Sequence, residues 1–196
     1  MHIFLSTSHP NHTGAWSLLA QCVREVWGLD PLPPVVRAEG GKPYFPDHPQ
    51  FHFNLSHSGP YTLCALSDSP VGADIQIIKD SWNPRLPARV CDPAQLAWLE
   101  TQPDQNRAFA LLWCLKEARV KQTGAGLREK IRAIAVPLPV PGRELYQLDG
   151  LWFRVYEGPD YWAAVCGDTV PPEILGSPLA GADSPCQGEM AAGQKG

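Results

Sequence analysis

Two carboxylates lie in sequence settings that could hold a metal ion. Asp74 interrupts the apolar run from Val71 to Ile78, and a buried carboxylate is costly unless it is paired or binds a metal. Glu117 lies in a helical pattern and shares a helix face with Lys121. If that helix packs across the strand, Asp74 and Glu117 can meet at one Mg²⁺, which binds one or two carboxylates together with phosphate oxygens and water. The alternative is a buried ion pair at Asp74 and a solvated Glu117–Lys121 pair.

Two further segments could bind a phosphate. In Phe53–Ser58, Ser56 and His57 follow a strand-like alternation and precede a turn, so they can present a hydroxyl, an imidazole and backbone N–H groups. The alternative is a turn in which the serines cap backbone groups and His57 is exposed. Gly41-Lys42-Pro43 is a glycine turn with one lysine. It is not a P-loop, and alone it indicates a surface turn.

A long helix and several strands must position these side chains. Asp104 is a suitable N-cap for a helix that runs to Thr123 and ends at Gly124. The largely apolar run at 71–78 predicts a central strand. Further helices are expected at 14–28 and 94–101, and further strands at 1–6, 51–55, 61–66, 131–136, 151–156 and 161–166. This order of elements indicates an α+β domain.

Composition narrows the class of protein. The 196 residues are 44% apolar, which suits one domain or two small halves, and the net charge of −4 argues against a general nucleic-acid binder. No apolar run is long enough to span a membrane and no basic signal segment begins the chain, so we expect no membrane partner and a cytoplasmic location. The six cysteines are irregularly spaced, which indicates reduced buried thiols.

The histidines and the C-terminal segment show two further patterns. The six histidines have no cysteine at ligand spacing, which argues against zinc. From about Gly176 the chain is rich in small and polar residues, and we expect 176–196 to be a disordered tail.

Five short motifs follow one another in a specific order. They are Gly41-Lys42-Pro43, Phe53–Ser58, Gly72–Ile75, Trp113–Lys121 and Gly124–Leu127. Together they resemble the GKP, FNxSHS, GxD and WxxKEAxxKxxGxGL series of the Sfp-type 4′-phosphopantetheinyl transferases, over about residues 12–170. The resemblance implies an α+β fold of two similar halves with pseudo-twofold symmetry and coenzyme A in the cleft between them. We place the halves at 1–78 and 79–175.

The resemblance also implies a reaction. A 4′-phosphopantetheine group would pass from coenzyme A to a serine of an apo acyl or peptidyl carrier protein, and adenosine 3′,5′-bisphosphate would leave. Asp74 and Glu117 would ligate Mg²⁺, and Gln76 would fill a position that is acidic in many relatives. Glu117 is also the expected base for the carrier serine. We expect the protein to act as a monomer.

The remaining roles concern the two substrates. Ser56, His57 and Lys121 would hold the pyrophosphate of coenzyme A, and Lys121 would thereby assist catalysis. The adenine nucleotide would lie near Lys42 and Pro43, and Lys116 would support the same anionic pocket. The carrier protein would dock beside a basic cluster after the long helix, for which the alternative is an ordinary solvated face. That cluster consists of Arg119, Arg128, Lys130 and Arg132.

Two departures from the family pattern keep other functions open. The acidic residue is replaced by Gln76, and no Lys or Arg precedes Arg24, although relatives use such residues to grip the 3′-phosphate of coenzyme A. Unless His9, His12 or Arg24 takes over this role, we expect poor discrimination against 3′-dephospho-coenzyme A. One alternative function is a catalytically weak module that binds carrier protein or coenzyme A. Another is a magnesium-dependent phosphoesterase that cleaves a nucleotide pyrophosphate with water.

Overall fold

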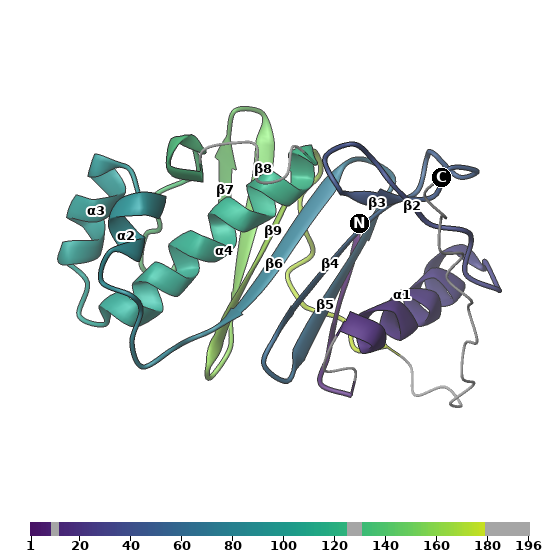
Figure 1. Cartoon of the computed structure of the whole chain (residues 1–196), viewed down its shortest axis with the longest axis horizontal. Helices are drawn as coiled ribbons and strands as arrows, with labels where there is room; N and C mark the ends of the chain where they lie inside the picture. Colours follow the sequence, from purple (N-terminus) through teal and green to yellow (C-terminus); the bar gives the residue numbers. More distant parts are fainter. Residues whose placement is uncertain (9–11, 125–130, 179–196) are drawn as a thin grey trace, which may run out of the picture.

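Two antiparallel sheets and two long helices make up most of the molecule (Figure 1). The structure, a computed structural model, describes residues 1–8, 12–124 and 131–178. The strands are β1 (His2–Ser6), β2 (Val36–Arg37), β3 (Pro43–Tyr44), β4 (His52–Ser58), β5 (Tyr61–Ser67), β6 (Val71–Ile77), β7 (Leu145–Leu148), β8 (Leu151–Glu157) and β9 (Tyr161–Gly167). The helices are α1 (His12–Trp27), α2 (Leu86–Val90), α3 (Pro93–Glu100), α4 (Gln105–Thr123) and the 3₁₀ turn η2 (Ile131–Ala133). The α+β class is confirmed.

The first sheet has the order β1-β5-β4 and packs against α1. Leu18, Leu19 and Val23 of α1 are fully buried against this sheet. The rings of Phe45 and Phe53 lie 4.6 Å apart in the same cluster. The side chain of Phe53 in β4 points into this core. Because successive side chains of a strand point to opposite faces, the residues of β4 at even-numbered positions face away from the core that Phe53 enters.

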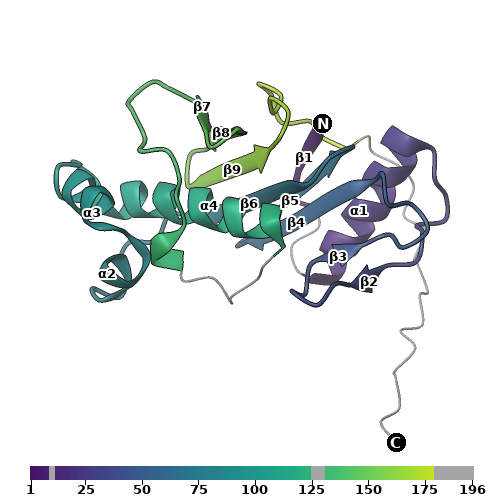
Figure 2. The same cartoon turned by 90° about the horizontal axis from the view of Figure 1, so that it is seen from above.

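The second sheet has the order β6-β9-β8-β7, and α4 lies across β6 and β9 (Figure 1). The predicted long helix is confirmed: the Asp104 side chain accepts a hydrogen bond from Arg107 N, and Gly124 ends the helix with φ 73°. One face of α4 is buried, with Cys114, Leu115 and Ala118 packed against the sheet. Figure 2 shows α2 and α3 at the opposite end of the molecule from α1.

Side chains rather than backbone groups join the two sheets. In Figure 1, β6 lies beside β4, but its backbone ladder is formed with β9. Three N–H groups of β6 donate to side chains of β4: Ala73 N to Asn54 Oδ1 (2.9 Å), Ile75 N to Ser56 Oγ (3.3 Å) and Ile77 N to Ser58 Oγ (3.0 Å). We call these three contacts the side-chain ladder. It satisfies backbone donors that would otherwise form an open sheet edge.

Some expected elements differ from the structure. The strand expected at 131–136 is wrong, because η2 occupies 131–133 and no strand follows before β7 in this described part of the chain. Lys116 Nζ donates to the carbonyl oxygens of Ile131, Arg132 and Ile134. In a strand, these carbonyl groups would bond to a neighbouring strand, so the contacts with Lys116 account for the difference. The expected central strand is β6, which ends its hydrogen-bonded sheet yet is covered by β4.

The ends of the expected halves are described in part. By hydrogen bonding, β6 belongs with the later strands, and the division at residue 78 stays a prediction. Gly176 is bonded to β1 through Ile3 O and Leu5 N, and residues 179–196 lie outside the described part of the chain. Among the described residues, no helix is both long and apolar enough to cross a membrane.

Gly72 allows α4 to approach β6 closely. A Cβ at this position would overlap the backbone oxygen of Ala118 and the backbone nitrogen of Gln122, both in α4. Backbone atoms cannot rotate away as a side chain can, so any larger residue must push the helix off the strand. The glycine of the GxD motif therefore sets the distance between Asp74 and α4.

Gly72→Ala is expected to lower the free energy of unfolding by about 2–3 kcal/mol, because the methyl group overpacks the interface. Urea denaturation measures the change. Gly142→Ala is the control, since its Cβ meets open space and only the positive φ of 73° is unfavourable; it should cost about 1 kcal/mol. Equal losses for both variants would contradict the close-approach argument.

Candidate active site

Asp74 lies where β6 packs against β4 and α4, and we call this place the seam. The residue is 5% exposed. Its Oδ1 accepts hydrogen bonds from Ser56 Oγ and from Lys121 Nζ, each at 2.7 Å. Its Oδ2 is also buried, yet it has no hydrogen-bond partner among the described residues. A buried carboxylate oxygen without a partner is costly, and a bound cation would remove that cost.

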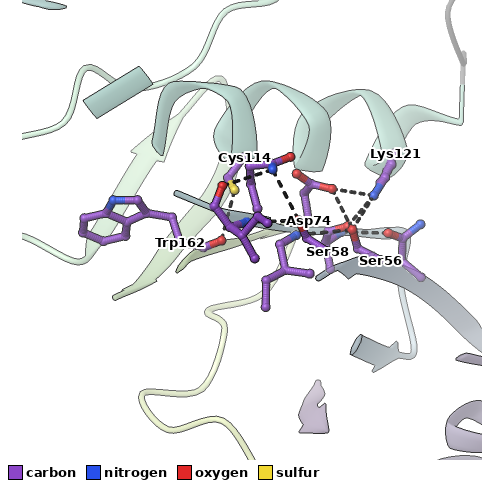
Figure 3. Close-up of polar contacts among 11 residues, drawn as sticks. Ser56, Ser58, Asp74, Cys114, Lys121 and Trp162 are labelled. Carbon is purple, nitrogen blue, oxygen red and sulfur yellow. Dashed lines mark hydrogen bonds and ion pairs between the residues drawn. The ribbon is translucent and has the colours of Figure 1, made fainter. Parts of the chain in front are cut away.

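Lys121 approaches this carboxylate from α4 (Figure 3). Its ammonium group donates to Asp74 Oδ1, to Ser56 Oγ at 3.0 Å and to Ala73 O at 3.2 Å. These three contacts use its three N–H donors. Lys121 therefore connects α4 to both β4 and β6.

Glu117 lies one turn before Lys121 and lines a cavity of about 230 Å³. The cavity is also lined by Gly40, Gly41, Lys42, Pro43, Asn54, Leu55, Val120, Lys121 and Gly124. Burial raises the pKa of Glu117, and the nearby Asp74 carboxylate raises it further, while Lys121 acts in the opposite direction. With both carboxylates ionised, Asp74 and Glu117 together with the single ammonium group of Lys121 have a net negative charge.

This donor set fits Mg²⁺. Within residues 1–8, 12–124 and 131–178, no group of three or more His, Cys, Asp or Glu side chains gathers as a metal cage. Mg²⁺ commonly uses one or two carboxylates and takes its other ligands from water and phosphate. Asp74 Oδ2 and the Glu117 carboxylate supply that pair. The Gln76 amide nitrogen donates to Ser58 Oγ and Ile77 O, which leaves its amide oxygen as a further oxygen donor.

The lysine of the glycine turn is held by the backbone. Lys42 Nζ donates to Val71 O at 2.9 Å and to Gln122 O at 3.0 Å. Burial lowers the pKa of Lys42 to about 8. Its stem and Pro43 line the cavity, so this turn forms one wall while the ammonium group ties it to α4.

Lys116 and His57 occupy different surroundings. None of the Lys116 side chain is exposed, and its Nζ binds the three carbonyl groups at 131–134 instead of facing the cavity. Burial also lowers its pKa. His57 is exposed on β4, beside the seam. The structure therefore brings Asp74, Glu117, Lys121, Ser56, Lys42 and Pro43 together, and it places Lys116 elsewhere.

Several residues near the site were not predicted from the sequence. Asn54 and Ser58 hold β6 through the side-chain ladder, and the polar alternation at 54, 56 and 58 was the signal for them. Cys114 of α4 is drawn with Asp74 in Figure 3; its thiol donates to Trp162 O, and burial raises its pKa, which keeps the thiol neutral. In the basic cluster, Arg119 donates to Gln122 Oε1. Arg128, Lys130 and the glycine motif at 125–127 lie outside the described residues.

Comparisons with known proteins now identify the family. The family model of the 4′-phosphopantetheinyl transferase superfamily matches residues 70–166. A 4′-phosphopantetheinyl transferase of Bacillus subtilis is 34% identical over 157 residues, which cover 76% of this chain and 70% of that relative. The chain belongs to the 4′-phosphopantetheinyl transferase superfamily. The resemblance in the motifs is thereby confirmed.

Other members of the superfamily match shorter spans. The 4′-phosphopantetheinyl transferase Sfp of Bacillus subtilis strain 168 is 33% identical over 65% of this chain and 60% of the relative. The 4′-phosphopantetheinyl transferase AcpT of Salmonella typhimurium is 43% identical over 49% of this chain and 52% of the relative. The span that the family model matches contains Asp74, Glu117 and Lys121.

Asp74→Asn and Glu117→Gln are each expected to weaken Mn²⁺ binding at least tenfold, because each removes one charged oxygen ligand. Electron paramagnetic resonance titration of the free enzyme with Mn²⁺, used as a probe for Mg²⁺, measures this affinity. Lys116→Met is the control: it should lower stability by about 2 kcal/mol through its unsatisfied carbonyl groups and leave Mn²⁺ affinity within about twofold. Unchanged affinity in both carboxylate variants would exclude this metal site.

Proposed function

We propose that this protein transfers 4′-phosphopantetheine from coenzyme A to a serine hydroxyl of an acyl or peptidyl carrier protein, with Mg²⁺ at Asp74 and Glu117. One observation carries the proposal: the buried Oδ2 of Asp74 has no partner among the described residues, and Lys121, which binds the other oxygen of this carboxylate, lines a cavity together with Glu117 and other residues of the family's motifs. Coenzyme A is the donor that the family implies. Asp74 and Glu117 would hold the Mg²⁺, and its positive charge would offset the negative charge of the pyrophosphate.

The chain's own groups account for the proton and the charge. The serine oxygen forms a bond to the β-phosphorus, and the bond to the leaving adenosine 3′,5′-bisphosphate breaks. Glu117 accepts the serine proton, directly or through water. His57 is exposed on β4, from which its imidazole can face pyrophosphate oxygens, and the Lys121 ammonium group contributes positive charge to the site while its donors hold Asp74 and Ser56. Positioning and electrostatics then supply most of the rate enhancement.

The proposal includes a cytoplasmic, monomeric enzyme. The five cysteines in the described part of the chain are all buried and free, which suits a reducing compartment. The two expected halves, 1–78 and 79–175, would meet where β6 packs against α4 and pairs with β9. In this arrangement the catalytic groups come from both sides of one seam: Asp74 from β6, and Glu117 and Lys121 from α4.

Intact mass spectrometry tests the transfer. The protein is incubated with coenzyme A, Mg²⁺ and a panel of apo carrier proteins. A carrier is expected to gain the mass of one phosphopantetheine group, and the gain should disappear when Mg²⁺ is omitted. Glu117→Ala is expected to lower the rate at least a hundredfold, because it removes both a metal ligand and the base.

Two controls make this experiment decisive. A carrier whose acceptor serine is replaced by alanine must gain no mass. Chromatography of the nucleotide products without any carrier detects the alternative phosphoesterase, which would release the bisphosphate with water as the nucleophile. Tight binding of coenzyme A or carrier with no mass gain on any carrier would instead indicate a binding module.

A further inference from the structure

We propose that Ser56 is a positioning residue: its hydroxyl group fixes the Asp74 carboxylate in the orientation that binds the metal ion, and it does not act as a pyrophosphate ligand. This inference rests on the proposed function only for the presence of a metal at Asp74. Three hydrogen bonds of the Ser56 hydroxyl group support this role (Figure 3).

The hydrogen-bonding capacity of the Ser56 hydroxyl is fully used. A serine hydroxyl offers one donor and two acceptor lone pairs. The donor is directed to Asp74 Oδ1 at 2.7 Å. The two acceptor sites receive Ile75 N at 3.3 Å and Lys121 Nζ at 3.0 Å. Because Ser56 is also buried, its hydroxyl group could donate a hydrogen bond to a phosphate oxygen only if its hydrogen bond to Asp74 were broken.

These contacts restrain the side chain of Asp74. The terminal torsion of an aspartate is broad, so the carboxylate can rotate unless its oxygens are held. Ser56 and Lys121 approach the same oxygen, Oδ1, from β4 and from α4. Holding Oδ1 in this way fixes the position of Oδ2, the oxygen without a partner. Such second contacts to a metal ligand commonly change metal affinity by about 10–100-fold.

Ser58 shows which part of this arrangement is specific to Asp74. Both serines accept an N–H group of β6 through the side-chain ladder, Ser56 from Ile75 and Ser58 from Ile77. In the described structure Ser58 does not bond to the Asp74 carboxylate, and its hydroxyl oxygen instead accepts a hydrogen bond from the amide nitrogen of Gln76. Removal of either hydroxyl group therefore breaks one rung of the ladder, but only the loss of Ser56 removes one of the two restraints on the Asp74 carboxylate.

The experiment compares Ser56→Ala with Ser58→Ala and with Ser56→Thr, which keeps the hydroxyl group. Electron paramagnetic resonance titration with Mn²⁺ measures metal affinity in the free enzyme, so the result does not require transferase activity. Calorimetric titration with coenzyme A at saturating Mn²⁺ measures substrate affinity, and thermal unfolding measures stability. Ser56→Ala is expected to weaken Mn²⁺ binding at least fivefold while coenzyme A affinity at saturating Mn²⁺ stays within twofold.

The other variants separate positioning from structural support. Ser58→Ala should lower the melting temperature by an amount similar to Ser56→Ala and keep Mn²⁺ affinity within about twofold, because it releases only the neutral Gln76 amide and not a carboxylate ligand; Ser56→Thr should restore Mn²⁺ binding. A loss of coenzyme A affinity in Ser56→Ala with normal Mn²⁺ binding would overturn the proposal and make Ser56 a substrate ligand. Equal loss of Mn²⁺ affinity in both alanine variants, or no Mn²⁺ binding by the unmodified protein, would also overturn it. Failure to transfer phosphopantetheine with the expected Mn²⁺ pattern intact would overturn the proposed function alone.

Discussion

A buried carboxylate on a strand between two sheets is the interaction on which the rest of this structure depends. The Asp74 carboxylate is paired there with the Lys121 ammonium group and the Ser56 hydroxyl group, and an uncompensated buried charge would cost several kcal/mol. Both partners must reach it from other elements. The absence of a side chain at Gly72 lets α4 come close enough for Lys121 to do so.

Much of the polar chemistry in the family's motifs therefore maintains the architecture. Lys42 ties the glycine turn to the last turn of α4, and Lys116 holds the segment that follows this helix. Asn54 and Ser58 occupy the N–H groups of β6 that face β4. These groups are committed to backbone atoms, whereas Asp74 Oδ2 has no hydrogen-bond partner among the described residues. In the proposed site, this oxygen and the Glu117 carboxylate would form a small, preorganised set of oxygens for a cation.

The sequence predicted the elements whose signals are local. The cap at Asp104, the C-terminal Gly124 and the apolar period between them gave α4 almost to the residue, and the apolar run around Asp74 gave β6. The partners of long, charged side chains depend on tertiary contacts that no spacing rule contains. Lys116 and Lys121 belong to one motif, yet they project to different sides of α4, and the carbonyl contacts of Lys116 replace the strand that the apolar pattern at 131–136 indicated.

In the proposed site, Asp74 Oδ2 and the Glu117 carboxylate bind one metal ion together. The most direct measurement is an anomalous difference map from crystals grown with Mn²⁺ and coenzyme A. We expect a single anomalous peak within coordination distance of both carboxylates, with Ser56 Oγ still donating to Asp74 Oδ1. A peak that contacts only one of the two carboxylates, or an Asp74 side chain without metal in fully loaded crystals, would contradict it.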